Sequence, residues 1–350
     1  MEPHGHISIN NSIEFVNMAS AEVWPGSGTP GDPIIISGYQ IDAEGGPFGI
    51  YIANTTINFV LRGCSVNNTR YVSEPYNVGA GVHLHNVSNC TVSDVEVSNC
   101  DVGILYNVGE GDLEVTGCRV FDNNAGGFTG YCHRVMNVSM TNNIFINNSC
   151  SGDPCEPGGG VRLFGWNNTT AVVNVRATGN TIDNNGTSGG LFRVGDFGEG
   201  DPAVYGRYVP FEVNVTLMDN HIIGGEGGGL KLLALSKLSL YAENNTILNG
   251  GSCSNRIGYN PGGYFVKDLE CVLKENILGR NNSEHWGDSW KIMAENEVEA
   301  SIQDNRISNT SFGSLRIGWA CGEIGVYSGI VDADIKGNNI TDCRGGGISV

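Results

Sequence analysis

The sequence predicts an all-β fold, a right-handed parallel β-helix of about ten to eleven coils. One observation is a nine-residue unit that recurs at steps of 23 to 40 residues. The other is a short alternating run that opens each coil with Gly, as in GIYIAN (49–54) and GVHLHN (81–86). Alternation with period two is typical of strands that bury one face. Regular recurrence indicates a solenoid in which each coil lies on the one before it.

The order of elements follows from these repeats. Residues 1–45 are predicted to form an N-terminal cap with the first strands, and residues 46–350 one continuous β-helix. Longer steps between units carry insertions at the corners, such as 195–210 and 281–290. The chain closes on GGGISV (345–350), which reads as the start of another coil. Because a bare coil exposes a strand edge, we expect self-assembly or further domains after Val350.

The fifth position of the nine-residue unit predicts a ladder. Neighbouring coils lie about 4.8 Å apart, so a side-chain amide can donate to one coil and accept from the other. Asn also tolerates the left-handed backbone of a tight corner. We therefore interpret this column as structural rather than catalytic. Its members are Cys64, Val95, Cys118, Asn143, Asn180, Asn220, Asn245, Asn276, Asn305 and Asn338.

The charge composition of the chain limits the kinds of molecule it is expected to bind. Only 16% of residues are charged, yet the net charge is −18. Such an acidic surface disfavours nucleic acid and anionic membranes, while it allows cations such as Ca²⁺. No apolar stretch approaches the length of a membrane-spanning helix, so we expect no membrane insertion within this chain.

Cysteines and sequons favour a secreted protein. Eleven cysteines exceed what most cytosolic proteins carry, and Cys150 and Cys155 in SCSGDPC are candidates for a disulfide within one loop. Fifteen Asn-x-Ser/Thr triplets are glycan acceptors if the protein is secreted, although Asn, Ser and Thr are also ordinary turn residues. The glycosylation candidates are Asn54, Asn67, Asn86, Asn137, Asn167, Asn214, Asn244, Asn281 and Asn309.

The N-terminal segments HISINNSIEF (6–15) and WPGSGTPGDPIIISGYQIDAEGG (24–46), followed by the first coil, resemble a known group. The chain resembles the right-handed β-helix repeat proteins of the NosD type and the carbohydrate-binding and sugar hydrolase group, especially secreted archaeal members. The resemblance implies an extracytoplasmic location and a polysaccharide ligand. It supplies no catalytic residue, because this architecture hosts many functions.

A saccharide-binding face is predicted on the outward side of the first strands. Alternation places Tyr51, His83, Leu105, Thr129 and Arg162 in one outward column and Ala53, His85, Asn107, Tyr131 and Phe164 in the next. Aromatic rings beside polar groups suit stacking on sugars. The alternative is a solvated face, or one covered by corner loops. The candidates are Tyr51, His83, Tyr131, Phe164, Trp166 and Trp319.

Catalytic candidates are few. Hydrolysis needs two carboxylates across the scissile bond, and the first strands contain almost none apart from Asp196. With Glu199 and Asp201 it could ligate Ca²⁺, or simply form a solvated acidic loop. A lyase would need a basic residue, for which Arg162 and Arg193 are the candidates.

Two histidines on the same face of one strand are candidate ligands for a transition metal. His83 and His85 stand two residues apart on one strand, and two such imidazoles can share a transition metal. A third ligand would be required, and His133 is the local candidate. We do not favour a metal site at this pair. No cofactor is expected with certainty, and Ca²⁺ is the one candidate.

These observations favour an extracellular, cell-surface β-helix protein that is non-catalytic and either structural or saccharide-binding. Its partners would be polysaccharides or cell-envelope components. The alternative is a polysaccharide lyase, hydrolase or epimerase acting on the outer first-strand face. Facing carboxylates in a cleft would favour the enzyme, and an uninterrupted face would favour the binding protein.

Overall fold

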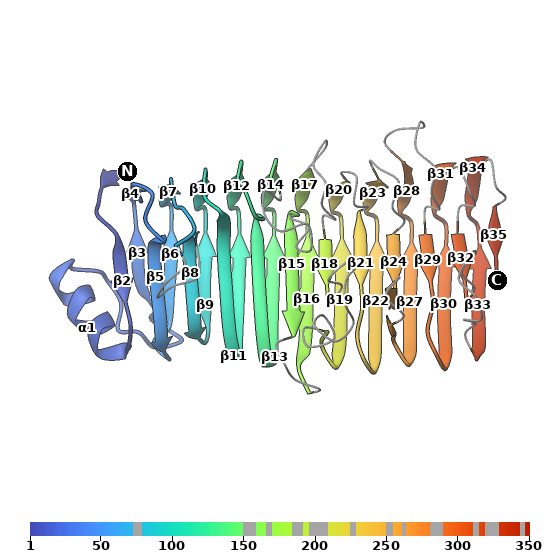
Figure 1. Ribbon diagram of the computed structural model, residues 1–350, viewed down its shortest axis with the longest axis horizontal. Coiled ribbons are helices and arrows are strands. Elements are labelled where there is room, and N and C mark those ends of the chain that lie inside the picture. Colours follow the sequence, from blue (N-terminus) through green and yellow to red (C-terminus); the bar gives the residue numbers. More distant parts are fainter. Residues whose placement is uncertain are drawn as a thin grey trace.

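The computed structural model is a parallel β-helix that runs from helix α1 (Ser12–Ala21) to the last strands near residue 350 (Figure 1). It describes residues 1–72, 79–149, 159–165, 170–183, 192–195, 209–224, 229–249, 255–260, 264–280, 290–310, 315–318, 329–343 and 347–350. Almost every strand pairs in parallel with the equivalent strand of the next coil. This confirms the predicted right-handed parallel β-helix.

The coils build three sheets. The first contains β2 (Ile7–Ile9), β5 (Phe48–Thr55), β8 (Ala80–Val87), β11 (Val102–Thr116), β13 (Phe128–Thr141), β15 (Val161–Gly165), β18 (Phe192–Val194), β21 (Leu230–Leu232), β24 (Asn255–Ile257), β29 (Trp290–Ile292), β32 (Leu315–Ile317) and β35 (Ile348–Ser349). The second contains β3 (Ile34–Ser37), β6 (Phe59–Arg62), β9 (Cys90–Ser93), β16 (Val172–Thr178), β19 (Glu212–Met218), β22 (Lys237–Glu243), β27 (Asp268–Lys274), β30 (Glu297–Gln303) and β33 (Ile330–Lys336). The long strands β11 and β13 continue from the first sheet into the second.

The third sheet has 12 strands and lies along the opposite edge of each coil. It contains β1 (Glu2–Pro3), β4 (Tyr39–Asp42), β7 (Ser65–Asn67), β10 (Glu96–Ser98), β12 (Arg119–Phe121), β14 (Ile144–Ile146), β17 (Thr181–Asp183), β20 (His221–Ile223), β23 (Thr246–Asn249), β28 (Ile277–Arg280), β31 (Arg306–Thr310) and β34 (Asn339–Cys343). A separate antiparallel pair, β25 (Tyr259–Asn260) and β26 (Tyr264–Phe265), follows β24.

Every second side chain of a strand points inward, and these apolar side chains form one continuous core. Ile50, Val82, Ile104, Phe128 and Val161 pair in register on successive coils and are fully buried. Burial of each such side chain contributes about 1.5–3 kcal/mol. The residues between them in each strand lie on the outer face, so register along the helix axis decides which outward side chains become neighbours.

The N-terminal residues close one end of the core. Asn11 caps helix α1, where its side-chain oxygen accepts from the backbone N–H groups of Ile13 and Glu14 at 3.0 Å. Phe15 and Ala19 bury against the coils. The sequence did not predict this helix. Residues 1–45 also supply a complete coil, because β2, β3 and β4 pair with β5, β6 and β7.

The predicted Asn ladder is present. The Asn143 side-chain oxygen accepts from the Cys118 backbone N–H at 2.9 Å, and its amide nitrogen donates to Val115 O at 2.8 Å and Asn180 Oδ1 at 2.9 Å. The same pattern repeats from Asn180 to Asn338. Each buried amide therefore joins two coils.

The expectation that these asparagines adopt the left-handed conformation is wrong. The residue before each ladder position does so instead, with φ between 53° and 66° at Gly63, Asp94, Gly117, Asn142, Gly179, Asp219, Asn244, Glu275, Asp304 and Gly337. This residue turns the chain from the second sheet to the third and leaves the next side chain pointing into the core. Gly, Asn and Asp tolerate this backbone best.

The described cysteines pack as apolar residues. Cys64, Cys90, Cys100, Cys118, Cys132, Cys271 and Cys343 are free thiols. Burial raises the pKa of Cys118 and Cys132 to about 11 and that of Cys271 to about 12, so these thiols are protonated and unreactive at neutral pH. The disulfides expected from the cysteine count are not found among these seven residues, and Cys150 and Cys155 lie outside the described residues.

Candidate functional site

The outward columns of the first sheet lie in the register that alternation predicted. Tyr51 pairs with His83, His83 with Leu105, Leu105 with Thr129, and Thr129 with Arg162. In the next column His85, Asn107, Tyr131 and Phe164 follow one another in the same way. The structure therefore brings Tyr51 next to His83 and Tyr131 next to Phe164, on different coils.

The described aromatic rings of this face are buried or half-buried. His83 is 9% exposed and Phe164 is 3% exposed, whereas Tyr51 and Tyr131 are half-buried. The rings pack on one another, with centroids 5.1 Å apart for Tyr51 and His83 and 5.6 Å for Tyr131 and Phe164. The expectation of an exposed platform is wrong for His83 and Phe164, because both rings are buried and pack on a neighbouring ring.

His83 and His85 are the two histidines of the predicted metal pair, and among the described residues no third side chain completes a metal-ligand group with them. The His83 and His85 rings lie 6.0 Å apart, and burial lowers the pKa of both, that of His83 to about 3. Neither ring nitrogen of His83 has a hydrogen-bond partner. Over the described ranges no group of three His, Cys, Asp or Glu side chains is arranged to hold a metal ion.

Several predicted site residues cannot be placed. Trp166, Trp319, Asp196, Glu199, Asp201, Asn167 and Asn281, and the side chain of Asn309, lie outside the described residues. The proposed calcium loop and two of the stacking tryptophans therefore stay predictions. Arg162 and Arg193 are described and are buried, at 5% and 2% exposure.

The second sheet carries an open groove of about 870 Å³ on its outer face. Its lining comes from β6, β9, β11, β13, β16 and β19, and Pro30 and Pro33 of the N-terminal segment wall one end. Six strands at about 4.8 Å spacing give it a length of roughly 24 Å along the helix axis. We call this hollow the second-sheet groove. Its outward lining residues are Asn58, Val60, Asn89, Thr91, Asp112, Glu114, Asn137, Ser139, Asn174, Arg176, Asn214 and Thr216.

A surface ladder of amides forms one side of this groove. The Asn137 amide donates to Asp112 Oδ1 at 2.6 Å, Asn174 donates to Asn137 Oδ1 at 2.7 Å, and Asn214 donates to Asn174 Oδ1 at 2.8 Å. Each link uses one of the two N–H groups of an amide. The second N–H of Asn137 and of Asn174 therefore remains for a ligand, whereas the Asn214 amide also donates to Glu212 Oε1 at 3.1 Å.

Two carboxylates and one cation lie in the same groove. Asp112 and Glu114 are exposed, two residues apart on one face of β11, which places their Cα atoms about 7 Å apart. Arg176 is exposed two coils further along the column that contains Glu114. The sequence did not single out these three residues, although GEGDLEV (109–115) shows both acids at same-face spacing.

The described sequons fall into two groups. Asn54, Asn86 and Asn244 are exposed, each at a left-handed corner with φ between 49° and 54°, and Asn67 is half-buried. Asn137 and Asn214 line the second-sheet groove. A glycan on either of these two would replace an amide hydrogen and fill the groove, so modification there and ligand binding exclude each other.

Comparison with known proteins identifies the fold family. A family model described as "right handed beta helix region" matches residues 9–198, which is more than half of the chain. No curated protein and no solved structure matches the chain. Among the residues described, no helix is long and apolar enough to cross a membrane.

Proposed function

Because this chain belongs to the right-handed β-helix family, we propose that it binds a linear polysaccharide along the second-sheet groove. The observation that carries the proposal is the groove itself, about 870 Å³, in which five of the six coils present an outward amide or hydroxyl and the sixth presents Asp112 and Glu114. A polysaccharide also repeats along its length and presents hydroxyls that both donate and accept. A one-dimensional ladder of Asn, Ser and Thr groups suits such a ligand.

The proposed binding face lies on the second sheet, whereas the sequence predicted it on the first. The His83 and Phe164 rings on the first-sheet face are buried, whereas the amides of the groove are exposed or half-buried. We place the protein outside the cell, at the cell surface, with polysaccharide or envelope components as partners. The many sequons and the resemblance to secreted NosD-type proteins support this location.

The binding test uses matched leucine substitutions in one outward column. Asn174 and Ser239 are both half-buried and are separated only by Asn214, but Asn174 lines the groove and Ser239 does not. We expect Asn174→Leu to weaken binding at least about tenfold, because it removes two polar links and fills the groove. Ser239→Leu should bind like the wild type. Affinity electrophoresis against a panel of neutral and acidic polysaccharides measures both, and equal retardation of the two variants would contradict the proposal.

Hydrolysis in the same groove is the second candidate, and Asp112 and Glu114 favour it. Inverting glycosidases hold two carboxyl groups about 6.5–9.5 Å apart, which same-face residues of one strand can satisfy. If the protein is a hydrolase, Asp112→Asn and Glu114→Gln should each abolish release of reducing ends by about 10²-fold or more while binding persists. Glu270→Gln, on the same sheet outside the groove, is the control. Absence of turnover by the wild type across the panel would leave binding as the function.

A further inference from the structure

The end of the second-sheet groove nearest the N-terminus is closed by residues 25–33, which we call the end wall. They precede β3, the strand of the second sheet that pairs with β6 on the side away from β9. None of the four residues of β3 lines the groove, whereas Pro30 and Pro33 of the end wall do. The groove therefore stops at β6, against the end wall.

Internal hydrogen bonds fix the shape of the end wall. Residues 29–32 form a tight turn with Pro30 at its second position, in which the Asp32 backbone N–H donates to Thr29 O at 3.1 Å. The Ser27 backbone N–H donates to Asp32 O at 3.0 Å and to Asp32 Oδ2 at 2.9 Å. Proline restricts the backbone further, so this loop has little conformational freedom.

Further hydrogen bonds attach the end wall to the second sheet. The carbonyl oxygen of Gly28 accepts from the Asn58 backbone N–H at 3.0 Å and from the Asn58 side-chain amide at 3.3 Å. The Ile35 backbone N–H in β3 donates to Pro25 O at 2.8 Å. Because the loop is bonded to the sheet at these two points, the end wall is a fixed barrier and not a lid that opens.

Asn89 places a polar side chain beside the end wall. It lines the groove directly before β9, one strand from Asn58. The residue is exposed and left-handed, with φ 59°, and its side-chain amide has no partner within the parts of the chain that the structure describes. The terminal sugar of a chain carries a hydroxyl where an internal sugar carries a glycosidic oxygen. An amide can donate to this hydroxyl and accept from it.

We propose that the second-sheet groove receives the end of a linear saccharide chain, with the terminal sugar against the end wall and beside Asn89. The inference rests on the proposed function, because it concerns the same groove and the same class of ligand. A chain bound by an internal segment must leave the groove in both directions, and the end wall blocks one of them. Pro30 and Pro33 offer ring carbons without a backbone N–H, so the wall limits the chain by shape and Asn89 supplies the polar contact.

The test counts protein molecules per saccharide chain as the chain is lengthened. The probes are a linear neutral β-glucan and a linear polyuronate, each fractionated by length up to several times the roughly 24 Å of the groove. Analytical ultracentrifugation with excess protein gives the number bound per chain. We expect one protein per chain at every length, because each chain has one end of the required kind. A number that rises in proportion to length would overturn binding at the chain end and would leave the groove as a binding site for internal segments.

Failure of the proposed function gives a different result. If the wild type binds neither probe, or if Asn174→Leu binds as well as the wild type, the groove is not the binding site and the inference falls with it. Chemical reduction of the chain end to an alditol then identifies the end that is bound. Loss of binding assigns the groove to the reducing end, and unchanged binding assigns it to the opposite end.

A glycine substitution tests the contact beside the end wall. Asn89→Gly removes the amide, and glycine adopts the left-handed backbone without strain. Asn147→Gly is the matched control, since Asn147 is also exposed and left-handed, with φ 52°, and does not line the groove. We expect Asn89→Gly to weaken binding of the retained probe about three- to tenfold, as loss of one hydrogen bond does, and Asn147→Gly to bind like the wild type. Equal affinity of the two variants would overturn the placement of the terminal sugar at Asn89.

Discussion

Asn245→Ala is expected to lower the free energy of unfolding by about 3–5 kcal/mol, among the largest effects of any single truncation in this chain. Asn245 is 1% exposed and lies in the middle of the ladder. Its side-chain oxygen accepts from the backbone N–H and the side-chain amide of Asn220, both at 2.9 Å. Its amide nitrogen donates to Leu217 O and to Asn276 Oδ1, also at 2.9 Å.

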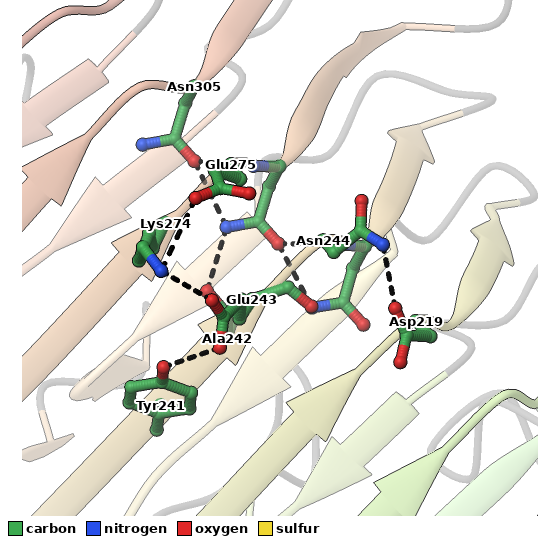
Figure 2. A network of polar contacts seen from close by, with 10 residues as sticks. Asp219, Tyr241, Ala242, Glu243, Asn244, Lys274, Glu275 and Asn305 are labelled. Atoms are coloured by element: carbon green, nitrogen blue, oxygen red, sulfur yellow. Dashed lines mark hydrogen bonds and ion pairs between the residues drawn. The ribbon is translucent and has the colours of Figure 1, made fainter.

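The size of the effect comes from the groups left behind. Alanine would leave the Asn220 backbone N–H and the Leu217 carbonyl buried without their partners, and each such group costs about 1–3 kcal/mol. Figure 2 shows the polar contacts around this part of the ladder, with Lys274 between Glu243 and Glu275. Asn276 follows Asn245 in the ladder, and Asn305 follows Asn276. Since coils contact only their neighbours, the loss should be felt most strongly on the two adjoining coils.

Urea unfolding measures the change in the free energy of unfolding of the whole protein. Hydrogen exchange at the Asn220 backbone amide measures the local loss of protection. The matched control is Asn137→Ala, which removes an amide from the surface ladder of the second sheet, where water can replace the lost partners. We expect the control to stay within about 1 kcal/mol of the wild type. An Asn245→Ala protein as stable as Asn137→Ala would show that the buried ladder does not hold the coils together.

The buried ladder could be predicted from sequence because its geometry admits very few side chains. A column that must donate in one direction and accept in the other selects Asn, so Asn143 and Asn305 stand out among variable neighbours. Helix α1 offers no comparable signal, since only Phe15 and Ala19 of its ten residues are buried. Helix α1 packs on the open end of the core, and this end forms only after the coils have stacked.

The second-sheet groove could not be predicted from the sequence, for a different reason. Outward residues such as Asn137 and Ser139 look like any solvated strand face until register places them beside their equivalents. The number of residues between equivalent outward positions varies with the corner insertions, so it does not reveal which side chains become neighbours. The strand register, which does reveal it, is known only from the structure.

Acid should destabilise this protein through His83, and His83→Phe should remove that sensitivity. The buried ring is packed between Tyr51 of β5 and Leu105 of β11, with His85 on its own strand. Burial, with a smaller contribution from the charge of His85, lowers the pKa of His83 from 6.5 to about 3. Between these two values the unfolded chain binds a proton that the folded protein does not. Stability is therefore complete above pH 6.5 and falls as the pH drops toward 3.

Each pH unit in this window costs about 1.4 kcal/mol, so moving from pH 7.5 to pH 5 should lower the free energy of unfolding by about 2 kcal/mol. His83→Phe keeps a ring against Tyr51, removes the titrating group and replaces two buried nitrogens that have no partner. Urea unfolding at pH 7.5 and pH 5 should show this drop in the wild type and in His221→Phe, which alters an exposed histidine of β20. An equal drop in His83→Phe would mean that other groups carry the acid sensitivity. If the loss of stability at pH 5 disappears in His83→Phe, the acid sensitivity comes from the buried His83 ring.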